Sequence, residues 1–480
     1  MTGTDGRARW LALLVLCLGD LMIVLDGTIV NVALPSIRDD LGFDQTGLAW
    51  VVNAYLLTFG GFLLLGGRLG DLFGHRRLFL GGVVLFTLAS LACGLAGSQS
   101  QLVAARAVQG LGGALVSAVA LSLVMMLFTD TAERAKAMGI FGFVLSGGGT
   151  AGVLLGGVIT DALSWNWIFL VNLPVGALVY ALSLRLLPAS PGTAARGRVD
   201  VAGAVTITGA LMLAVYAIVN GNETGWASPR TLGLLAAAAV LLAAFLVREA
   251  RIATPLVPLG LFRNRNVSAA NAVGVLMAAG MFAYFFFSAL YLQQVLGYTP
   301  LEVGLAYLPS MVVWGTASLF SDRLVLRFGI RPPLVAGLGL MALALVLLAR
   351  TPVDGSFLAD VLPPTLALGL GCGIAFNPIL LAAMSDVGPE QSGLASGVVN
   401  TSFMMGGALG LAVIASLAAS RTDTLLASGE EALVALNRGY HVAFLVGAIF
   451  TVLAAGLAGV LLRATAAVPH GEPAPAPAAD

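Results

Sequence analysis

The sequence predicts an all-α integral membrane protein with fourteen membrane-spanning helices. Two observations lead to this prediction. Of the 480 residues, 59% are hydrophobic and 10% are charged, and the mean hydropathy is +0.96. A soluble domain carries about 25% charged residues. The apolar residues also fall into runs of about 20, the length that a helix needs to cross the hydrocarbon core of a bilayer.

Fourteen such runs follow one another along the chain. We place the spans at residues 10–32, 47–67, 78–97, 102–128, 137–160, 166–187, 200–220, 231–248, 267–292, 303–321, 333–350, 361–384, 393–419 and 440–463. The first run follows RARW directly and is too long for the apolar region of a cleavable signal. We therefore expect it to remain in the mature protein.

Basic residues are distributed unevenly between the loops. Of the 24 lysine and arginine residues, a small group falls on one side of the membrane when the spans alternate: Arg38, Arg230, Arg350, Arg421 and Arg438. The others, apart from Arg106 inside a span, fall on the opposite side. Cytoplasmic loops carry the excess of Lys and Arg, so both termini are expected in the cytoplasm. Abundant Ala, Gly and Arg hint at a GC-rich bacterial genome, which places the protein in the plasma (inner) membrane of a bacterium.

The two ends of the chain resemble each other. QGLGGALVSAVALSLVMM (109–126) matches LGLGCGIAFNPILLAAM (368–384), and LGFDQTGLAW (41–50) is echoed by LGYTPLEVGLAYL (296–308). The offset exceeds the length of six helices and their loops, so two further helices are inserted between the halves. We predict an N-terminal six-helix bundle (1–190), two inserted linker helices with cytoplasmic flanks (191–265), a C-terminal six-helix bundle (266–465) and a disordered cytoplasmic tail (466–480). Parallel halves of this kind occur in secondary transporters, with the binding site near the bilayer midplane.

Two carboxylates and one arginine lie inside the predicted spans. Asp20 and Asp26 belong to the first span, and Arg106 lies about one turn inside the outer end of the fourth. A carboxylate at membrane depth costs about 2.5–3.5 kcal/mol on insertion scales. Asp26 lies about 9 Å outward of Asp20 and points about 120° away from it, so the two are not expected to share a partner. For Asp20, the simpler alternative is a protonated side chain that is hydrogen-bonded within the bundle.

GGRLGDLFGHRR (66–77) fills the predicted cytoplasmic loop between the second and third spans. Its glycines permit a tight turn. Asp71 can form a salt bridge or cap a helix, and Arg76 and Arg77 can reach acidic partners or helix C-termini. A charge cluster that joins two bundles can act as a latch that breaks during alternation. Alternatively, the basic residues of this loop only reflect the usual excess of Lys and Arg on the cytoplasmic side.

The sequence resembles the major facilitator superfamily, in which this loop has the pattern G-x-L-x-D-x-x-G-x-R-R. The matching residues are Gly67, Leu69, Asp71, Gly74, Arg76 and Arg77. Within the superfamily, the chain is similar to the drug:proton antiporters with fourteen spans. That similarity rests on LDGTIVNVALPSI (25–37), RAVQGLGGAL (106–115), WNWIFLVNLPVG (165–176) and YLQQVLGYTPLEVGLAYLP (291–309), and it covers the whole chain.

The resemblance implies two pseudo-symmetric six-helix bundles plus two inserted helices, and it assigns roles to some residues. It links the arginine of the fourth span, here Arg106, to proton transfer; snorkelling to the outer headgroups is the alternative. Asp26 belongs to a shared stretch at a depth similar to that of Arg106, where an ion pair or a packing role is the alternative. Asp20 lies outside the family pattern and is our candidate for the residue that selects the cargo. Asn31 and Gln109, from the same stretches, complete the proton-coupling and substrate candidates.

The fifth span contains GGGTAGVLLGG (147–157), which places Gly148, Gly152 and Gly156 on one face with Gly157 beside them. Small residues at this spacing allow close approach of a partner helix. In the family this segment is associated with antiport and often carries Gly-Pro. Here Gly152 is followed by Val153, so the proline kink is absent, which weakens the case for antiport over other coupling.

The ninth span contains MFAYFFFSALYLQQ (281–294), whose aromatic residues cannot all face one direction. Most of them are expected to pack against lipid or neighbouring helices. The candidates for lining a cavity are Tyr284, Tyr291 and Gln294 in the ninth span, and Asn400 and Phe403 in the thirteenth. Phe403 stands where relatives often carry polar or basic residues, and would make a cavity more apolar if it faces inward.

The favoured function is proton-coupled export of small hydrophobic or cationic molecules by alternating access. Burial of a carboxylate favours its protonated form, so proton and substrate can compete for it. The alternative is a proton-coupled symporter that takes up a small metabolite, because a fold does not settle direction or substrate.

Other classes of function are not expected. The sole lysine, Lys136, does not fit a P-loop, so ATP is not expected as a partner. His75, His441 and His470 have no metal-ligand spacing. The zero net charge suggests no nucleic-acid partner. We expect no enzyme activity, no metal and no cofactor besides the proton gradient. The partners are then a small-molecule substrate, protons and the lipid bilayer around a monomer.

Overall fold

The computed structural model describes residues 6–128, 130–188, 200–252, 255–384, 387 and 389–462, and these residues form helices and no strand. The predicted tail at 466–480 lies outside them. The helices are α1 (Gly6–Leu41), α2 (Gln45–Phe73), α3 (His75–Gly94), α4 (Gln99–Leu127), α5 (Thr131–Ala162), α6 (Asn166–Leu170), α7 (Asn172–Leu186), α8 (Val201–Val219), α9 (Gly221–Thr224), α10 (Pro229–Arg251), η1 (Leu259–Arg263), α11 (Arg265–Leu290), η2 (Tyr291–Val295), α12 (Pro300–Phe328), α13 (Arg331–Leu348), η3 (Phe357–Val361), α14 (Leu362–Met384), α15 (Pro389–Ala427) and α16 (Ala432–Leu461).

The predicted spans correspond to these helices. Among the described residues, thirteen helices are long and apolar enough to cross a membrane. The predicted fifth span falls in α5, of which only the apolar part 151–162 enters that comparison, so a total of fourteen stays a prediction. The predicted sixth span is interrupted: α6 ends at Leu170 and α7 begins at Asn172, two residues before Pro174.

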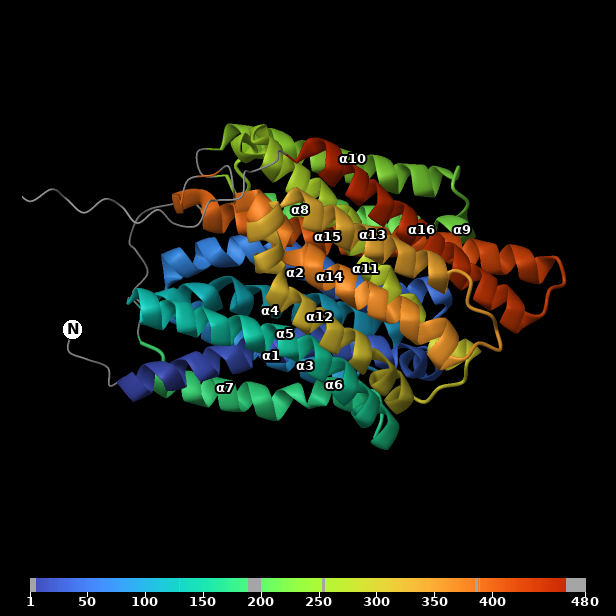
Figure 1. The fold of residues 1–480 in the computed structure, drawn as a ribbon, viewed down its shortest axis with the longest axis horizontal. Coiled ribbons are helices and arrows are strands. Elements are labelled where there is room, and N and C mark those ends of the chain that lie inside the picture. Colours follow the sequence, from blue (N-terminus) through green and yellow to red (C-terminus); the bar gives the residue numbers. More distant parts are fainter. Residues whose placement is uncertain are drawn as a thin grey trace, which may run out of the picture.

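The two halves of the chain pack in the same way (Figure 1). In the N-terminal half, α2 and α3 pack on α4, while α1 packs on α5 and α7. In the C-terminal half, α12 and α13 pack on α14, while α11 packs on α15 and α16. We call α1–α7 the N-terminal bundle and α11–α16 the C-terminal bundle.

The inserted helices α8 and α10 pack on each other, and α8 also contacts one helix of each bundle, α2 and α15. Their ends are defined by capping: the Asp200 side chain accepts from the Gly203 amide, and the Ser228 side chain accepts from the Thr231 amide. A capping side chain satisfies one of the amides that a helix N-terminus leaves unpaired. α10 lies along one edge of the molecule in Figure 1.

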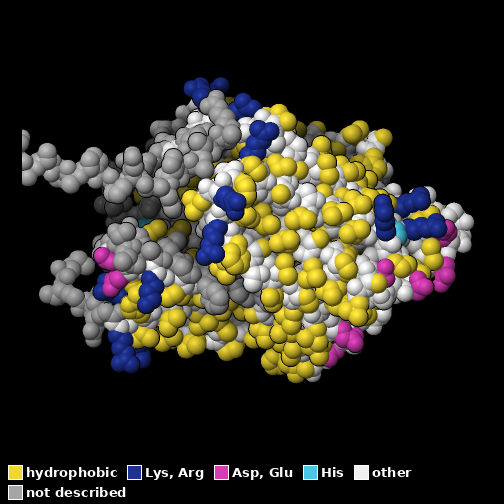
Figure 2. All heavy atoms as spheres, in the orientation of Figure 1, with side chains coloured by type: hydrophobic (Ala, Val, Ile, Leu, Met, Phe, Trp, Pro, Cys, Tyr) yellow, Lys and Arg dark blue, Asp and Glu magenta, His cyan; other side chains and the backbone are white. Residues whose placement is uncertain are grey.

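The bundles meet mainly through two helix pairs, α2 with α15 and α5 with α12. Figure 2 shows the outer surface of one face: hydrophobic side chains cover its middle, and charged side chains gather toward the two ends. Among the large hydrophobic side chains of the chain, Leu319, Val240 and Val460 are well exposed. A band of exposed apolar surface is what a bilayer requires of a spanning protein.

Candidate functional site

A polar network lies buried in the N-terminal bundle around Asp26. Arg106 Nη1 contacts Asp26 Oδ2 at 2.5 Å. Gln109 Nε2 and Asn172 Nδ2 both donate to Asp26 Oδ1, at 2.7 and 2.9 Å. Gln109 also donates to Ser90 Oγ at 2.8 Å. We call these five residues the Asp26 network; they come from α1, α3, α4 and α7, so the network connects four helices.

Other groups of the Arg106 side chain also have partners, and an aromatic ring lies against the guanidinium. Its Nε donates to the backbone oxygen of Val51 at 2.9 Å, and its Nη1 donates to Gln109 Oε1 at 2.7 Å. The ring of Tyr55 lies 4.3 Å from the guanidinium carbon. Arg106 and Asp26 are each only 1% exposed. Arg106 therefore does not reach the headgroups, and it forms the ion pair with Asp26 that the depths of the two residues suggested.

Two members of the Asp26 network, Ser90 and Asn172, were not among the sequence candidates. Asn172 lies in the stretch 165–176 that carries the family resemblance, which was the available signal. Ser90 carried none, because a serine in a membrane helix commonly bonds its own backbone. Ser90 does so as well, donating to the Phe86 oxygen at 2.8 Å while its own oxygen accepts from Gln109.

Asp20 has a different environment from Asp26. It is 3% exposed, and its Oδ1 accepts a hydrogen bond from Ser117 Oγ on α4 at 2.6 Å. Within the described part of the chain, no basic side chain forms an ion pair with it. An ionised carboxylate without a counter-charge is costly at this depth. Asp20 is thus the buried carboxyl of the bundle that can hold a proton at low cost.

The bundles are in close contact at the end where α1 finishes and α12 begins. Gln293 of the C-terminal bundle donates from Nε2 to the Val32 oxygen of α1 at 2.8 Å. A Cβ on Gly157 of α5 would lie 2.5 Å from the Pro300 oxygen of α12. A Cβ on Gly304 would lie 3.1 Å from the Val153 oxygen. On this side, α1 and α5 therefore pack directly against the C-terminal bundle.

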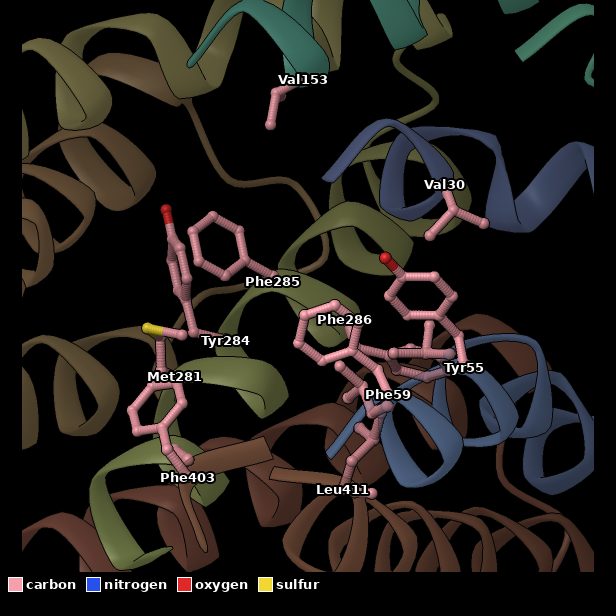
Figure 3. Close-up of a cluster of buried hydrophobic side chains, with 14 of the residues drawn as sticks. Val30, Tyr55, Phe59, Val153, Met281, Tyr284, Phe285, Phe286, Phe403 and Leu411 are labelled. Atoms are coloured by element: carbon pink, nitrogen blue, oxygen red, sulfur yellow. The ribbon is translucent and has the colours of Figure 1, made fainter. Parts of the chain in front are cut away.

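Side chains from both bundles form an apolar cluster where the bundles meet (Figure 3). Val30 and Tyr55 come from the N-terminal bundle, and Tyr284, Phe285 and Phe403 from the C-terminal bundle. All five are at most 8% exposed. Two of the candidates for lining a cavity, Tyr284 and Phe403, thus lie in this cluster. Phe403 also packs against the rings of Phe282 and Phe376, at centroid distances of 6.1 and 5.7 Å.

The other candidates from the sequence lie elsewhere. Tyr291 Oη donates to the Pro352 oxygen, and Gln294 Oε1 accepts from Tyr440, so both bond within the C-terminal bundle. Asn31 donates only to oxygens of its own helix, Gly27 and Thr28. Asn400 is half-buried on α15. These hydrogen bonds join Tyr291, Gln294 and Asn31 to residues other than Asp20 and Asp26.

The segment 66–77, expected to be a loop, is mostly helical. α2 continues through Gly67 to Phe73, and the turn is confined to Gly74, whose φ of 94° favours glycine. Arg76 donates to the Leu184 oxygen of α7, within its own bundle. Arg77 is exposed, and the side chain of Asp71 lies outside the described residues.

The glycines of α5 face two different helices. A Cβ on Gly148 would meet Leu21 at 2.7 Å, and a Cβ on Gly152 would meet Thr28 Oγ1 at 2.0 Å. A Cβ on Gly156 would approach Ile29, also on α1. Gly157 instead faces α12 of the other bundle. One small-residue segment thus allows close packing both within the N-terminal bundle and between the bundles.

The chain is similar in sequence to several antibiotic resistance and export proteins. It is 39% identical to the puromycin resistance protein pur8 of Streptomyces alboniger, over 96% of this chain and 92% of the relative. It is 38% identical to the cephamycin export protein CmcT of Amycolatopsis lactamdurans, over 96% of this chain and 94% of the relative. The tetracenomycin C resistance and export protein of Streptomyces glaucescens is 36% identical, over 88% of this chain and 78% of the relative.

Solved transporters share the fold at low sequence identity. A bacterial homologue of the lysosomal transporter Spinster, in an inward-facing conformation, superposes with a TM-score of 0.69 at 16% identity, covering 95% of this chain and 97% of that chain. The D-xylose–proton symporter superposes with a TM-score of 0.67 at 15% identity, covering 95% and 99%. The model of the Major Facilitator Superfamily matches residues 16–411. Together with the relatives above, this match shows that the chain belongs to the Major Facilitator Superfamily.

Proposed function

We propose that this protein exports small amphipathic antibiotics or related drugs by proton antiport, and that Asp20 carries the proton. The relatives named for puromycin resistance and for export of cephamycin and tetracenomycin C support export of this class of compound. The proton gradient is the energy source, without ATP or a cofactor. The protein works as a monomer in the bacterial plasma membrane, with both termini in the cytoplasm.

The choice of Asp20 rests on the contrast with Asp26. Asp26 receives Arg106, Gln109 and Asn172, so protonating it would leave a buried guanidinium without its counter-ion. Asp20 receives one hydrogen bond from the neutral Ser117. A protonated Asp20 keeps that bond and loses its charge, which suits a group that alternates between proton and cationic substrate.

Alternating access requires that contacts between the bundles break and re-form on each side in turn. The outer contacts between Gln293 and Val32, and between Gly157 and Pro300, fit a state closed toward the outside. A substrate would then enter from the cytoplasm, displace the proton from Asp20 and leave when these outer contacts separate. The apolar cluster with Tyr284, Phe285 and Phe403 supplies aromatic surface for an amphipathic molecule.

The test compares D20N with D39N in everted membrane vesicles. Asp39 is an exposed acid on the same helix, paired with Arg38, and serves as the matched acid-to-amide control. Energised vesicles that contain the wild type or D39N should accumulate puromycin or a fluorescent cation until an uncoupler is added. D20N, present at equal amounts, should lose this proton-driven accumulation. Retained accumulation in D20N would disprove the role of Asp20.

Symport of a metabolite gives a different result in cells. If the protein imports rather than exports, its deletion leaves the susceptibility to puromycin, cephamycin and other amphipathic compounds unchanged. The export proposal predicts that deletion lowers the inhibitory concentration of at least one of them. Complementation with D20N should fail to restore it, while complementation with D39N should succeed.

A further inference from the structure

A second pair of buried acids lies away from the transport core, at the ends of the inserted helices. Four carboxylic side chains are buried among the described residues: Asp20, Asp26, Asp200 and Glu249. Asp200 precedes α8 and is 2% exposed, and Glu249 lies in the last turn of α10 and is 3% exposed. By the distribution of basic residues, this end faces the cytoplasm. Neither residue has a role in the proposed export mechanism.

One oxygen of each acid has donors, and the other has none. Asp200 Oδ1 accepts from the Gly203 amide at 2.8 Å and from Arg248 Nε at 2.6 Å. Glu249 Oε2 accepts from the Val257 amide at 2.9 Å. The remaining atoms, Asp200 Oδ2 and Glu249 Oε1, are fully buried and receive no hydrogen bond from the described residues.

These two unpaired oxygens lie on the same side of α8. A Cβ built on Gly203 would lie 2.6 Å from Asp200 Oδ2 and 2.9 Å from Glu249 Oε1. Both oxygens therefore border the same small space beside the Gly203 Cα. Glycine at position 203 leaves the space in which both oxygens sit. Two acceptor atoms thus lie beside the same space, and no hydrogen-bond donor of the described residues reaches either of them.

Two ionised carboxylates cannot occupy this arrangement at low cost. An ionised carboxylate only accepts hydrogen bonds, whereas a protonated one also donates. Like charges at this separation also repel, so one member of such a pair keeps its proton. Arg248 can balance one negative charge, and a single proton neutralises the other. Three other charged side chains lie at this end of the described parts of α2, α8, α10, α15 and η1: Arg68, Arg251 and Arg263. Among the described residues, the basic side chain that forms an ion pair with Asp200 is Arg248.

We propose that Asp200 and Glu249 form a proton-binding site, in which one shared proton joins the N-terminus of α8 to the C-terminus of α10. The site is separate from Asp20, so its test does not depend on transport.

The site also fixes the chain that leads into the C-terminal bundle. Glu249 holds the Val257 amide, and the neighbouring Leu256 packs with Leu65 of α2 and Ala204 of α8. Val257 packs against a cluster that contains Val398 of α15. The segment 256–257 thus contacts helices of both bundles. Loss of the shared proton would separate the two acids and loosen this segment, so cytoplasmic pH would control its attachment.

The experiment measures the thermal unfolding temperature of the purified full-length protein in detergent between about pH 5 and pH 9. A proton held by the folded pair stabilises the protein at low pH, and this stabilisation is lost as the pH rises and the proton leaves. E249Q supplies a permanent amide donor toward Asp200 and keeps an acceptor for Val257. The wild type should lose about 2–4 °C more than E249Q across this range. D200N should behave like E249Q, whereas D44N, which alters the N-cap acid that accepts from the Gly47 amide at the start of α2, should behave like the wild type.

Two spectroscopic and exchange measurements complete the test. Infrared difference spectra should show a carboxylic acid C=O band in the wild type that is absent in E249Q. Amide hydrogen exchange of the peptide around 255–262 should be several-fold faster at high pH in the wild type than in E249Q at the same pH. Identical pH dependence of unfolding in the wild type and E249Q, or an unchanged acid band, would overturn the shared proton. Because both amide variants are isosteric, a general folding failure would itself contradict the proposed geometry.

Discussion

Asn172 of α7 donates a hydrogen bond to Asp26 of α1 at 2.9 Å, although 146 residues separate them in the sequence. The acceptor is the same Oδ1 atom that receives Gln109, while Arg106 binds the other oxygen. The carboxylate therefore has partners on both oxygens, from α4 and from α7. The hydrogen bond from Asn172 therefore holds α7 against the rest of the N-terminal bundle.

Asn172→Ala should lower the stability of the folded protein by about 1.5–3 kcal/mol, because it removes a hydrogen bond to a buried charged acceptor. Thermal unfolding in detergent measures the loss. Asn166→Ala is the matched control, since the Asn166 side chain donates to a neutral backbone oxygen, that of Gly94, at 3.1 Å. The control should cost about 0.5–1.5 kcal/mol. Equal losses of stability in the two variants would show that the hydrogen bond from Asn172 to Asp26 contributes no more than one to a neutral acceptor.

Asp26→Asn should destabilise the protein by about 3–5 kcal/mol, because it leaves the buried guanidinium of Arg106 without a counter-charge. The double variant Asp26→Asn/Arg106→Gln removes both charges and should regain much of that loss. Expression level and unfolding temperature report the difference. If the double variant is less stable than Asp26→Asn alone, the ion pair is not what determines the cost.

Much of the fold could be predicted because the bilayer imposes strong rules on the sequence. Apolar runs of the right length correspond to the helices, and the repeated glycine patterns match the repeated packing of α2–α4 and α12–α14. The pairing of Arg106 was also accessible, since a buried arginine needs an anion and Asp26 lay at a similar depth. The resemblance to a transporter family carried the rest of the fold prediction.

The parts that could not be predicted depend on how helices rotate about their axes. Sequence alone does not say which polar face meets which neighbour, so Ser90 and Asn172 could not be joined to Asp26. The placement of Tyr291 and Gln294 within their own bundle is of the same kind. Segment 66–77 was expected to be a loop because it falls between two predicted spans, and its glycines were expected to permit a turn. Glycines inside a membrane helix also serve packing: a Cβ on Gly70 would lie 2.6 Å from Val119.

Gly152→Ala should destabilise the N-terminal bundle by about 1–3 kcal/mol, because an added methyl group overpacks a tight contact. A Cβ there would lie 2.0 Å from Thr28 Oγ1 and 3.0 Å from the Leu25 oxygen. Gly149→Ala, where nothing lies within 4 Å, is the control and should be neutral or slightly stabilising. Adding Thr28→Ala to Gly152→Ala should recover part of the lost stability, because it removes the hydroxyl that the new methyl group meets. If stability is not recovered, the contact with the Leu25 backbone oxygen causes the destabilisation instead.

Asn53 of α2 is a fully buried polar side chain that lacks hydrogen-bond partners among the described residues. It is 0% exposed, and neither its amide nitrogen nor its amide oxygen forms a hydrogen bond. It lies two helical turns before Gly60, hence on the same face. A Cβ on Gly60 would lie 3.0 Å from Met404 of α15, and one on Gly397 would lie 2.8 Å from Leu64. Asn53 therefore faces the C-terminal bundle, opposite an apolar stretch of α15.

An unsatisfied buried amide costs about 1–3 kcal/mol, and this cost applies only while the bundles are packed together here. When they separate during transport, water can satisfy Asn53. Asn53→Leu should therefore raise the unfolding temperature and slow drug export, because it stabilises the packed arrangement relative to the separated one. Thr58→Val is the control, since Thr58 already bonds the Ala54 oxygen of its own helix at 2.9 Å. Export by Asn53→Leu at the rate of the wild type, with an unchanged unfolding temperature, would show that this amide does not bias the transport cycle.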